Sequence, residues 1–183
     1  YELFEKRDNM KTIKKDVLSE KKILSYLGKT DINYRLHIYD SVPSTNELAK
    51  KMIYTGEALA GSIIIASTQT AGRGRLERSF YSPVGGIYIS FIFDGRQLFH
   101  KEAFLLFAPC VAVCLTLEQQ FGINSQIKWP NDIMIDNKKV CGVLTETQMN
   151  KDSDTIIISI GINYSTNLDL FPDEVKKTAG SLR

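Results

Sequence analysis

Runs of β-branched and aromatic residues constrain this chain most, because such runs predict strands packed in a sheet. SIIIAST at 62–68 predicts a buried strand, and GGIYISFIF at 85–93 and DTIIISIGINY at 154–164 predict two further strands. A fourth run, RLHIYD at 35–40, alternates in polarity as a half-buried strand does. A sheet therefore has to form the centre of the fold.

Three other segments have apolar residues at helical spacing. In residues 44–56, Ser44 and Glu47 predict a capping box, and Gly56 predicts the helix end. The other two helices are predicted at 19–28, as a short helix that ends at Gly28, and at 101–120, as a long buried helix interrupted or begun near Pro109.

Residues 133–147 predict a hairpin that turns at Asp136 and Asn137, because two strand-like stretches flank a pair of turn-forming residues. Helices thus interrupt a sheet that contains at least one hairpin. We predict an α+β, or mixed α/β, fold with a central mixed or antiparallel sheet and packed helices. The 183 residues suffice for one compact domain with a core.

The charge pattern favours a local cationic site over a generally basic surface. The net charge of +2 gives no general argument for a nucleic-acid or membrane partner. The apolar runs predict no membrane span, and the charged start YELFEKRDNMK does not resemble a signal peptide. We therefore expect a cytoplasmic protein.

The cysteines and histidines argue against several classes of site. Three cysteines make no disulfide framework, and Cys110 and Cys114 lie one helical turn apart in an apolar stretch, which predicts core packing. His37 and His100 are far apart and have no metal-ligand spacing around them. A zinc site and a Ser/His/Asp hydrolase are both disfavoured.

The segment TAGRGRLERSF, residues 70–80, directly follows a buried strand and alternates glycine with arginine. Glycine lets a backbone approach a ligand closely, and arginine presents a planar set of donors suited to carboxylate and phosphate. The pattern predicts an anion-binding loop. Its structural alternative is a solvated, flexible connection.

Three further features are weak when taken singly. In KWPND, residues 128–132, the simplest interpretation is a turn at Pro130 to Asp132 with Trp129 in the core. Lys139 beside the hairpin turn would ordinarily be solvated. A glycine inside the strand SIGIN, residues 159–163, marks either a bulge or the close approach of a ligand or backbone.

Together these features resemble the biotin protein ligases over about residues 35–182. The motifs occur in the order and at roughly the spacing of that family: STN at 44–46, TQTAGRGRLER at 68–78, SPVGGIYIS at 82–90, KWPND at 128–132, KKVCGVLTE at 138–146 and GIN at 161–163. The resemblance implies a catalytic domain whose fold is similar to that of class II aminoacyl-tRNA synthetases.

The resemblance also implies a reaction in two steps. Biotin and ATP, with Mg²⁺, would form biotinyl-5′-AMP and pyrophosphate, and the biotinyl group would then pass to a lysine of a biotin carboxyl carrier protein, such as the acetyl-CoA carboxylase subunit. Lys139 and Arg73 would be catalytic, with Lys139 bridging the biotin carboxylate and the α-phosphate. Gly72 and Gly74 would let the backbone fold over the ligand.

The other implied contacts divide into two sets. The biotin-binding set is Ser44, Thr45, Gln69, Gly72, Arg73, Arg75, Tyr88, Lys139, Gly142, Leu144 and Ser159. The set for ATP and the adenylate is Arg75, Arg78, Phe80, Asn131, Asp132 and Asn163, with Asp132 as a possible Mg²⁺ ligand. Two residues depart from the family's usual pattern, which has tryptophan at Phe80 and glycine at Ser159.

The resemblance implies further regions and partners. Residues 1–30 would be a linker with a short helix, and Tyr1 to Phe4 a remnant of a winged helix-turn-helix domain; residues 31–183 would be the catalytic domain, without the family's small C-terminal domain. A homodimer is possible, and DNA would be a partner only if that N-terminal domain exists. The alternatives are a lipoate or octanoate ligase, an inactive truncated fragment, or the effector-binding part of a biotin-responsive repressor.

Overall fold

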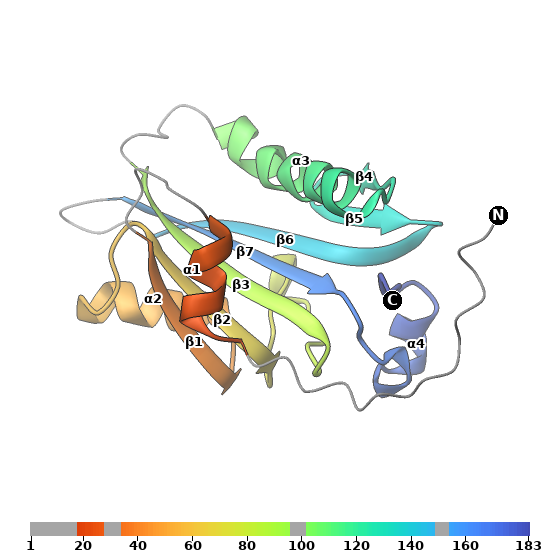
Figure 1. The fold of residues 1–183 in the computed structure, drawn as a ribbon, viewed down its shortest axis with the longest axis horizontal. Coiled ribbons are helices and arrows are strands. Elements are labelled where there is room, and N and C mark those ends of the chain that lie inside the picture. The colour runs from red at the N-terminus through yellow and green to blue at the C-terminus, as the bar shows by residue number, and fades with distance from the viewer. Residues whose placement is uncertain (1–17, 28–33, 96–101, 149–153) are drawn as a thin grey trace.

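A seven-stranded sheet forms the centre of the computed structural model, which describes residues 18–27, 34–95, 102–148 and 154–183 (Figure 1). The strand order is β1-β2-β3-β7-β6-β5-β4. Among the described strands, β1 and β2 pair in parallel and every other neighbouring pair is antiparallel. The predicted mixed sheet is therefore confirmed. The strands are β1 Arg35–Val42, β2 Ser62–Gln69, β3 Gly86–Asp94, β4 Gln126–Lys128, β5 Asp132–Ile135, β6 Lys138–Gln148 and β7 Thr155–Asn163.

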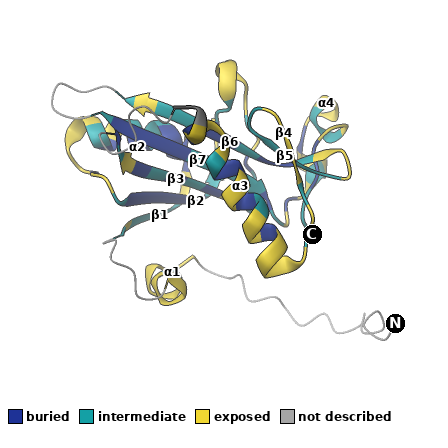
Figure 2. Cartoon of the chain, turned by 90° about the horizontal axis from the view of Figure 1, so that it is seen from above, coloured by how far each residue is buried: buried dark blue, intermediate teal, exposed yellow. Residues whose placement is uncertain are grey.

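Helices lie on both faces of this sheet. Figures 1 and 2 show α2 on one face and both α1 and α3 on the other. The short α4 follows β7 near the C-terminal end. The helices are α1 Glu20–Leu27, α2 Thr45–Thr55, α3 Glu102–Phe121 and α4 Asp173–Lys176, and short 3₁₀ turns lie at Arg75–Glu77 and Leu168–Leu170.

Helix α2 begins and ends where its sequence predicts, with the Ser44 half of the predicted capping box, while the Glu47 carboxylate bonds Lys50 and Arg73. The Ser44 hydroxyl accepts a hydrogen bond from the Glu47 backbone N–H at 3.4 Å, and Gly56 closes the helix with a φ of 75°. Because α2 connects two parallel strands, its cap places residues 44–46 beside the end of β2. Gly28, the predicted end of α1, lies outside the described residues, as do residues 1–17.

Each face of the sheet has its own apolar cluster. The cluster under α2 contains Ala49, Met52, Ala58, Ile64, Ile92 and Ile157. The cluster under α3 contains Leu105, Cys110, Val113, Leu117, Ile133, Val140, Cys141, Val143, Ile156 and Ile158, with Cys114 packed against it. The predicted core packing of Cys110 and Cys114 is confirmed, and burial, with Cys114 and Asp132 nearby, raises the pKa of the Cys110 thiol to about 11.

Helix α3 runs through Pro109 without a break, contrary to the predicted interruption or start there. A proline has no N–H, so the carbonyl four residues earlier, that of Leu105, loses its helical partner. The Thr145 hydroxyl on β6 donates to that carbonyl at 3.1 Å. The neighbouring strand therefore satisfies the group that the proline leaves free.

The outer side of α3 is exposed and apolar. Phe104, Leu115 and Phe121 are 55%, 47% and 51% exposed, and Figure 2 shows the exposed stripe along the helix. Contrary to the expectation from the sequence, Phe104–Phe121 is long and apolar enough, by length and composition alone, to cross a membrane. Core helices of soluble domains have the same property, and α3 packs its inner side on the sheet.

Candidate active site

A cavity of about 400 Å³ lies where the N-terminus of α2 meets the ends of β2, β6 and β7. Three groups of side chains share it: hydroxyl and amide groups at one end, arginines from the glycine-arginine segment, and Lys139 with Asp132. Its walls are Ser44, Thr45, Asn46, Gln69, Arg73, Gly74, Arg75, Leu76, Arg78, Ser79, Phe80, Lys128, Trp129, Pro130, Asn131, Asp132, Lys139, Gly142, Val143, Leu144, Ser159, Ile160 and Gly161.

The glycine-arginine segment folds as a small hairpin, here called the GRGR hairpin, residues 72–80. Its ends are joined by a backbone hydrogen bond from Phe80 N–H to Gly72 O at 2.8 Å. Two further bonds, from Gly74 N–H to Arg78 O at 2.8 Å and from Arg78 N–H to Arg75 O at 3.2 Å, close its tip. The segment is thus a hydrogen-bonded hairpin.

Two residues without glycine's freedom make the turn of this hairpin. Leu76 and Glu77 have φ values of 54° and 59°, as in the type I′ turns that favour Asn-Gly. Side chains other than Gly, Asn and Asp are uncommon in that region of backbone space. Leu76 is also 80% exposed, so its apolar side chain extends from the rim of the cavity into solvent.

The two glycines of the GRGR hairpin differ in what surrounds them. A Cβ at Gly72 would lie 2.4 Å from Phe80 O and 2.6 Å from Ser82 Oγ, so no side chain fits there. A Cβ at Gly74 would meet Arg78 O at 3.5 Å, which is ordinary contact. Close packing of the hairpin base therefore requires glycine at one position only.

Acidic side chains hold the guanidinium of Arg73. Arg73 Nη1 lies 2.5 Å from a Glu47 carboxylate oxygen, and Nη2 lies 2.6 Å from both oxygens of Glu77. Lys50 extends the network, since its Nζ contacts Glu47 at 3.0 Å and Glu146 at 2.9 Å. The pKa of Arg73 is raised, first by Glu47, and the pKa of Glu47 is lowered because Lys50 and Arg73 outweigh the opposing effect of burial.

Lys139 is held by its backbone and by its charge. Its N–H donates to Thr178 O at 2.7 Å, and its carbonyl accepts from Gly180 N–H at 2.8 Å, which ties the start of β6 to the segment after α4. Its Nζ lies 2.5 Å from Asp132 Oδ1 and 5.7 Å from the centre of the Phe80 ring. The amine therefore lies on the cavity wall in an ion pair, although the side chain is still 34% exposed.

The polar end of the cavity is a connected hydrogen-bond network. Asn46 Nδ2 donates to Ser159 Oγ at 3.0 Å, and the hydroxyls of Ser159 and Ser90 lie 2.8 Å apart. Ser90 donates to Thr45 Oγ1 at 2.8 Å. Gln69 Oε1 accepts from the backbone N–H of Thr45 at 2.8 Å and from its hydroxyl at 3.2 Å.

The network continues to the base of the GRGR hairpin. Gln69 Nε2 donates to Ser82 Oγ at 2.8 Å, and the Ser82 hydroxyl donates to Phe80 O at 2.9 Å. The Phe80 ring fills the space over Gly161, where a Cβ would lie 2.4 Å from a ring carbon. The glycine of SIGIN thus admits an aromatic ring of the protein itself.

A second cavity, of about 250 Å³, adjoins the first across shared walls. Arg78, Ser79, Phe80, Asp132 and Lys139 line both. The remaining walls of the second cavity are Tyr81, Asn163, Phe171, Val175, Thr178 and Ala179. Phe80 and Lys139 therefore stand between two ligand-sized spaces.

The structure gathers most of the predicted site residues at the first cavity and Asn163 at the second, and the roles implied for them stay predictions. Tyr88, predicted to contact biotin, lines neither cavity in this structure: it is fully buried, packs edge-on against Phe80 and donates to Pro83 O at 2.7 Å. Gly72 lies at the hairpin base rather than on the cavity wall.

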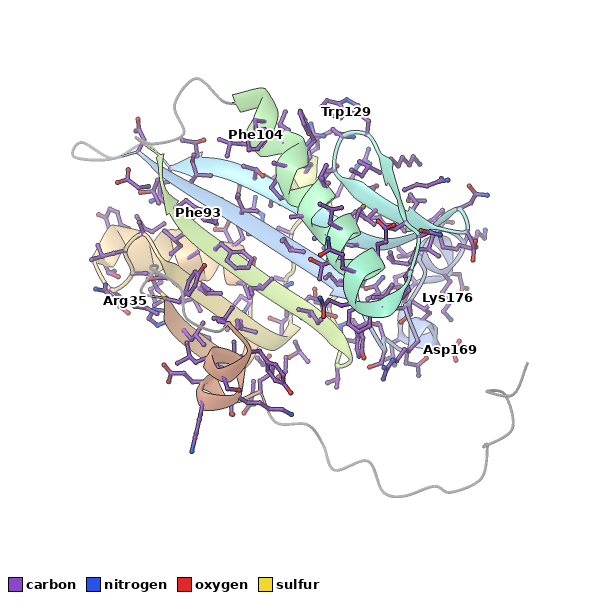
Figure 3. The ribbon with its side chains drawn as sticks, turned by 45° about the horizontal axis from the view of Figure 1, so that its top comes forward. Arg35, Phe93, Phe104, Trp129, Asp169 and Lys176 are labelled. Carbon is purple, nitrogen blue, oxygen red and sulfur yellow. The ribbon has the colours of Figure 1, made fainter. Side chains whose placement is uncertain are left out.

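Trp129 also differs from the simplest sequence interpretation. It is 66% exposed and lines the first cavity instead of packing in the core. Its ring centre lies 6.5 Å from that of Phe107 on α3, and Figure 3 shows the side of the molecule that carries Trp129 and Phe104. Sequence analysis missed its position, and it also missed Asn46, Leu76, Phe171 and Val175 as cavity residues.

Known proteins match the region that builds this site. The model of the biotin/lipoate A/B protein ligase family matches residues 38–163, which contain all the walls of the first cavity. The chain belongs to this family. The resemblance drawn from the motifs is confirmed.

Among curated relatives, the bifunctional ligase/repressor BirA of Bacillus spizizenii is 39% identical over 97% of this chain and 55% of its own length. BirA of Escherichia coli is 30% identical over 81% of this chain and 45% of its own length. The chain therefore spans about half the length of these family members.

Solved structures agree with the fold. The biotin protein ligase of Aquifex aeolicus in complex with biotin and ATP superposes with a TM-score of 0.69 and 36% identity, covering 81% of this chain and 59% of that one. The Leishmania major enzyme in complex with biotinyl-5-AMP gives a TM-score of 0.65 and 26% identity over 81% of this chain and 63% of that one. The predicted fold class is confirmed.

Proposed function

We propose that this chain activates biotin with ATP to form biotinyl-5′-AMP and then transfers the biotinyl group to a lysine of a carrier protein. The observation that carries the proposal is the position of Lys139, which lines both cavities and lies between them. The Aquifex relative was solved in complex with biotin and ATP, which supports the proposal that this chain binds the same two ligands. The first cavity would hold biotin, and the second would hold the nucleotide.

The first step brings two anions together. A biotin carboxylate oxygen would bond to the α-phosphorus of ATP while the bond to the β-phosphate oxygen breaks and pyrophosphate leaves. At about 4 Å, two unit charges interact by roughly 1 kcal/mol in water and roughly 4 kcal/mol at an effective dielectric of about 20. Cations fixed in a partly enclosed cavity are therefore effective, and Lys139, Arg73 and Arg75 are placed to supply them.

The polar end of the first cavity favours biotin over lipoate. Ser44, Thr45, Asn46 and Ser90 are each at most 3% exposed, so their polar atoms need partners inside the protein or on a ligand. The cyclic urea of biotin has donors and an acceptor for them, whereas the dithiolane ring of lipoate has neither an N–H nor a carbonyl. Buried polar groups left unpaired disfavour the ligand that lacks matching groups.

Magnesium would arrive with the nucleotide. Among the described residues, no group of three or more His, Cys, Asp or Glu side chains forms a metal site. Asp132 is the carboxylate on the wall of both cavities, and oxygen ligands suit Mg²⁺. One protein carboxylate with phosphate oxygens and water is a normal set for this ion, which would neutralise the departing pyrophosphate.

In the second step, the lysine amine of the carrier would attack the acyl carbon of the adenylate, and AMP would leave. One relative is named for ligation to acetyl-CoA carboxylase, which supports a biotin carboxyl carrier domain as the acceptor. A cytoplasmic location and a catalytic domain over residues 31–183 belong to the same proposal. The name of the Bacillus relative includes both a ligase and a repressor, and the cavities of this chain support the ligase activity.

The proposal is tested by incubating the chain with biotin, Mg-ATP and a purified biotin carboxyl carrier domain. We expect biotin-dependent release of pyrophosphate and a carrier whose mass increases by one biotinyl group. Lipoate in place of biotin is the matched control and should give neither signal. Release of pyrophosphate with lipoate but not with biotin would contradict the proposal and support the alternative branch of the family.

A further inference from the structure

The hydrogen bonds at the polar end have a direction that the backbone fixes. The backbone N–H of Thr45 can only donate, so the Gln69 side-chain atom 2.8 Å away has to be its oxygen. That oxygen can only accept, and it also receives the proton of the Thr45 hydroxyl. Thr45 can then only accept from Ser90, at 2.8 Å.

The same assignment of donors and acceptors extends through the hydroxyl groups to Asn46. Since the Ser90 proton is committed to Thr45, the 2.8 Å contact between the two serines uses the proton of Ser159. Ser159 then has only its lone pairs left, and it accepts from the Asn46 amide nitrogen at 3.0 Å. The Asn46 amide is thereby oriented, with Oδ1 turned away from Ser159.

The oriented oxygen has no donor of its own. Asn46 is 3% exposed and lines the first cavity, and among the described residues its Oδ1 has no hydrogen-bond partner. A buried acceptor without a donor is unfavourable. The network is complete only when something else in the cavity supplies a hydrogen.

We propose that Ser159 is a positioning residue that fixes Asn46 as an acceptor, so that this end of the cavity selects a ligand with an N–H donor. The inference rests on the proposed function and refines it: the donor would be a ureido N–H of biotin, while the urea carbonyl would be met by donors outside this chain of hydroxyls.

The test compares biotin with its two cyclic carbamate analogues, in each of which oxygen replaces one ureido N–H. Calorimetric dissociation constants are measured for the wild type, Ser159→Ala, Ser159→Thr and Ser62→Ala. Ser62 on β2 provides the matched control. It is a buried serine outside the network, and its hydroxyl accepts a hydrogen bond from the Leu59 N–H. Thermal unfolding is followed for every variant, and Ser159→Gly replaces the alanine variant if the latter does not fold.

We expect the wild type to bind at least one carbamate tenfold or more weakly than biotin, since its ring oxygen would face the Asn46 oxygen. In Ser159→Ala the amide can turn and donate, so this ratio should fall below threefold, whereas Ser159→Thr and Ser62→Ala keep the wild-type ratio. The KM for biotin should rise several-fold in Ser159→Ala with little change in kcat for pyrophosphate release.

An unchanged ratio in Ser159→Ala, or an equal fall in Ser62→Ala, would overturn the inference. Failure of the proposed function gives a different result, namely no biotin-dependent pyrophosphate release by the wild type. The two outcomes are therefore separable in one set of measurements.

Discussion

Lys139 Nζ and Asp132 Oδ1 form an ion pair of 2.5 Å on the wall between the two cavities. A ligand anion that needs the lysine therefore has to share it with an acid or displace that acid. In the proposed reaction, displacement of the lysine would leave the Asp132 carboxylate free to bind Mg²⁺. One contact thus couples the two binding spaces.

Replacing Lys139 by alanine should lower the rate of biotinyl-adenylate formation by about 100-fold or more, because it removes a fixed cation where negative charge converges. The lysine side chain is 34% exposed and its ion pair is accessible to solvent, so the melting temperature should change little. Pyrophosphate release and thermal unfolding measure the two effects. Lys138→Ala is the control, because that exposed side chain donates to Lys177 O instead of lining a cavity. Equal losses of activity in both variants would contradict the role proposed for Lys139.

Alanine at Gly72 and at Gly74 should have unequal effects. At Gly72 the added Cβ would lie 2.4 Å from a backbone oxygen, so the base of the GRGR hairpin must shift, whereas Gly74 has room. We expect Gly72→Ala to reduce adenylate formation strongly and Gly74→Ala to reduce it much less. Hydrogen exchange of residues 72–80 reports the hairpin directly, and similar behaviour of the two variants would show that close packing is not the cause.

Glu77→Gln should strengthen the capture of anionic substrates. Glu77 is an exposed partner of Arg73, and exposed ion pairs contribute roughly 0.2–1 kcal/mol, so its loss should lower the KM for biotin or ATP by about 1.4- to fivefold. Steady-state pyrophosphate release measures this change. Glu118→Gln on α3 is the charge-matched control, and a raised KM in Glu77→Gln alone would mean that the carboxylate assists binding.

Acid should loosen the network around Glu47. Its pKa lies below the ordinary value of 4.5, so the charged form stabilises the folded state above that value, and the contribution is lost as the pH falls through the lower folded pKa. Glu47→Gln removes this contribution. Its melting temperature should therefore depend less steeply on pH than that of the wild type below about pH 5, and parallel curves would contradict the assignment.

The fold was predictable where local chemistry agrees with packing. The Ser44 N-cap begins α2, and the turn at Asp136 and Asn137 joins β5 to β6, as their residue types require. Pro109 was misjudged because the carbonyl it frees is satisfied by Thr145, which lies 36 positions along the chain from it. No local pattern contains that contact.

The site was predictable as a set of motifs but not as a geometry. Tyr88 lies in a matching motif, yet the alternation of β3 turns it into the core behind Phe80. Asn46 belongs to the STN motif. The orientation of its amide, which leaves the oxygen without a partner, depends on its hydrogen bond to Ser159, 113 residues away. Trp129 is exposed and contacts the partly exposed Phe107 of α3, a contact across 22 positions that no local pattern contains.

The network from Asn46 through Ser159, Ser90, Thr45 and Gln69 joins α2 to three strands of the sheet. A ligand bound at that end therefore contacts the sheet and helix that are expected to unfold together, rather than a peripheral loop. In differential scanning calorimetry, the ligand should shift a single unfolding transition to higher temperature without splitting it. At a ligand concentration one hundred times the dissociation constant, the added stability should be about 2.7 kcal/mol. If the proposed function holds, biotin would then stabilise the same domain that activates it.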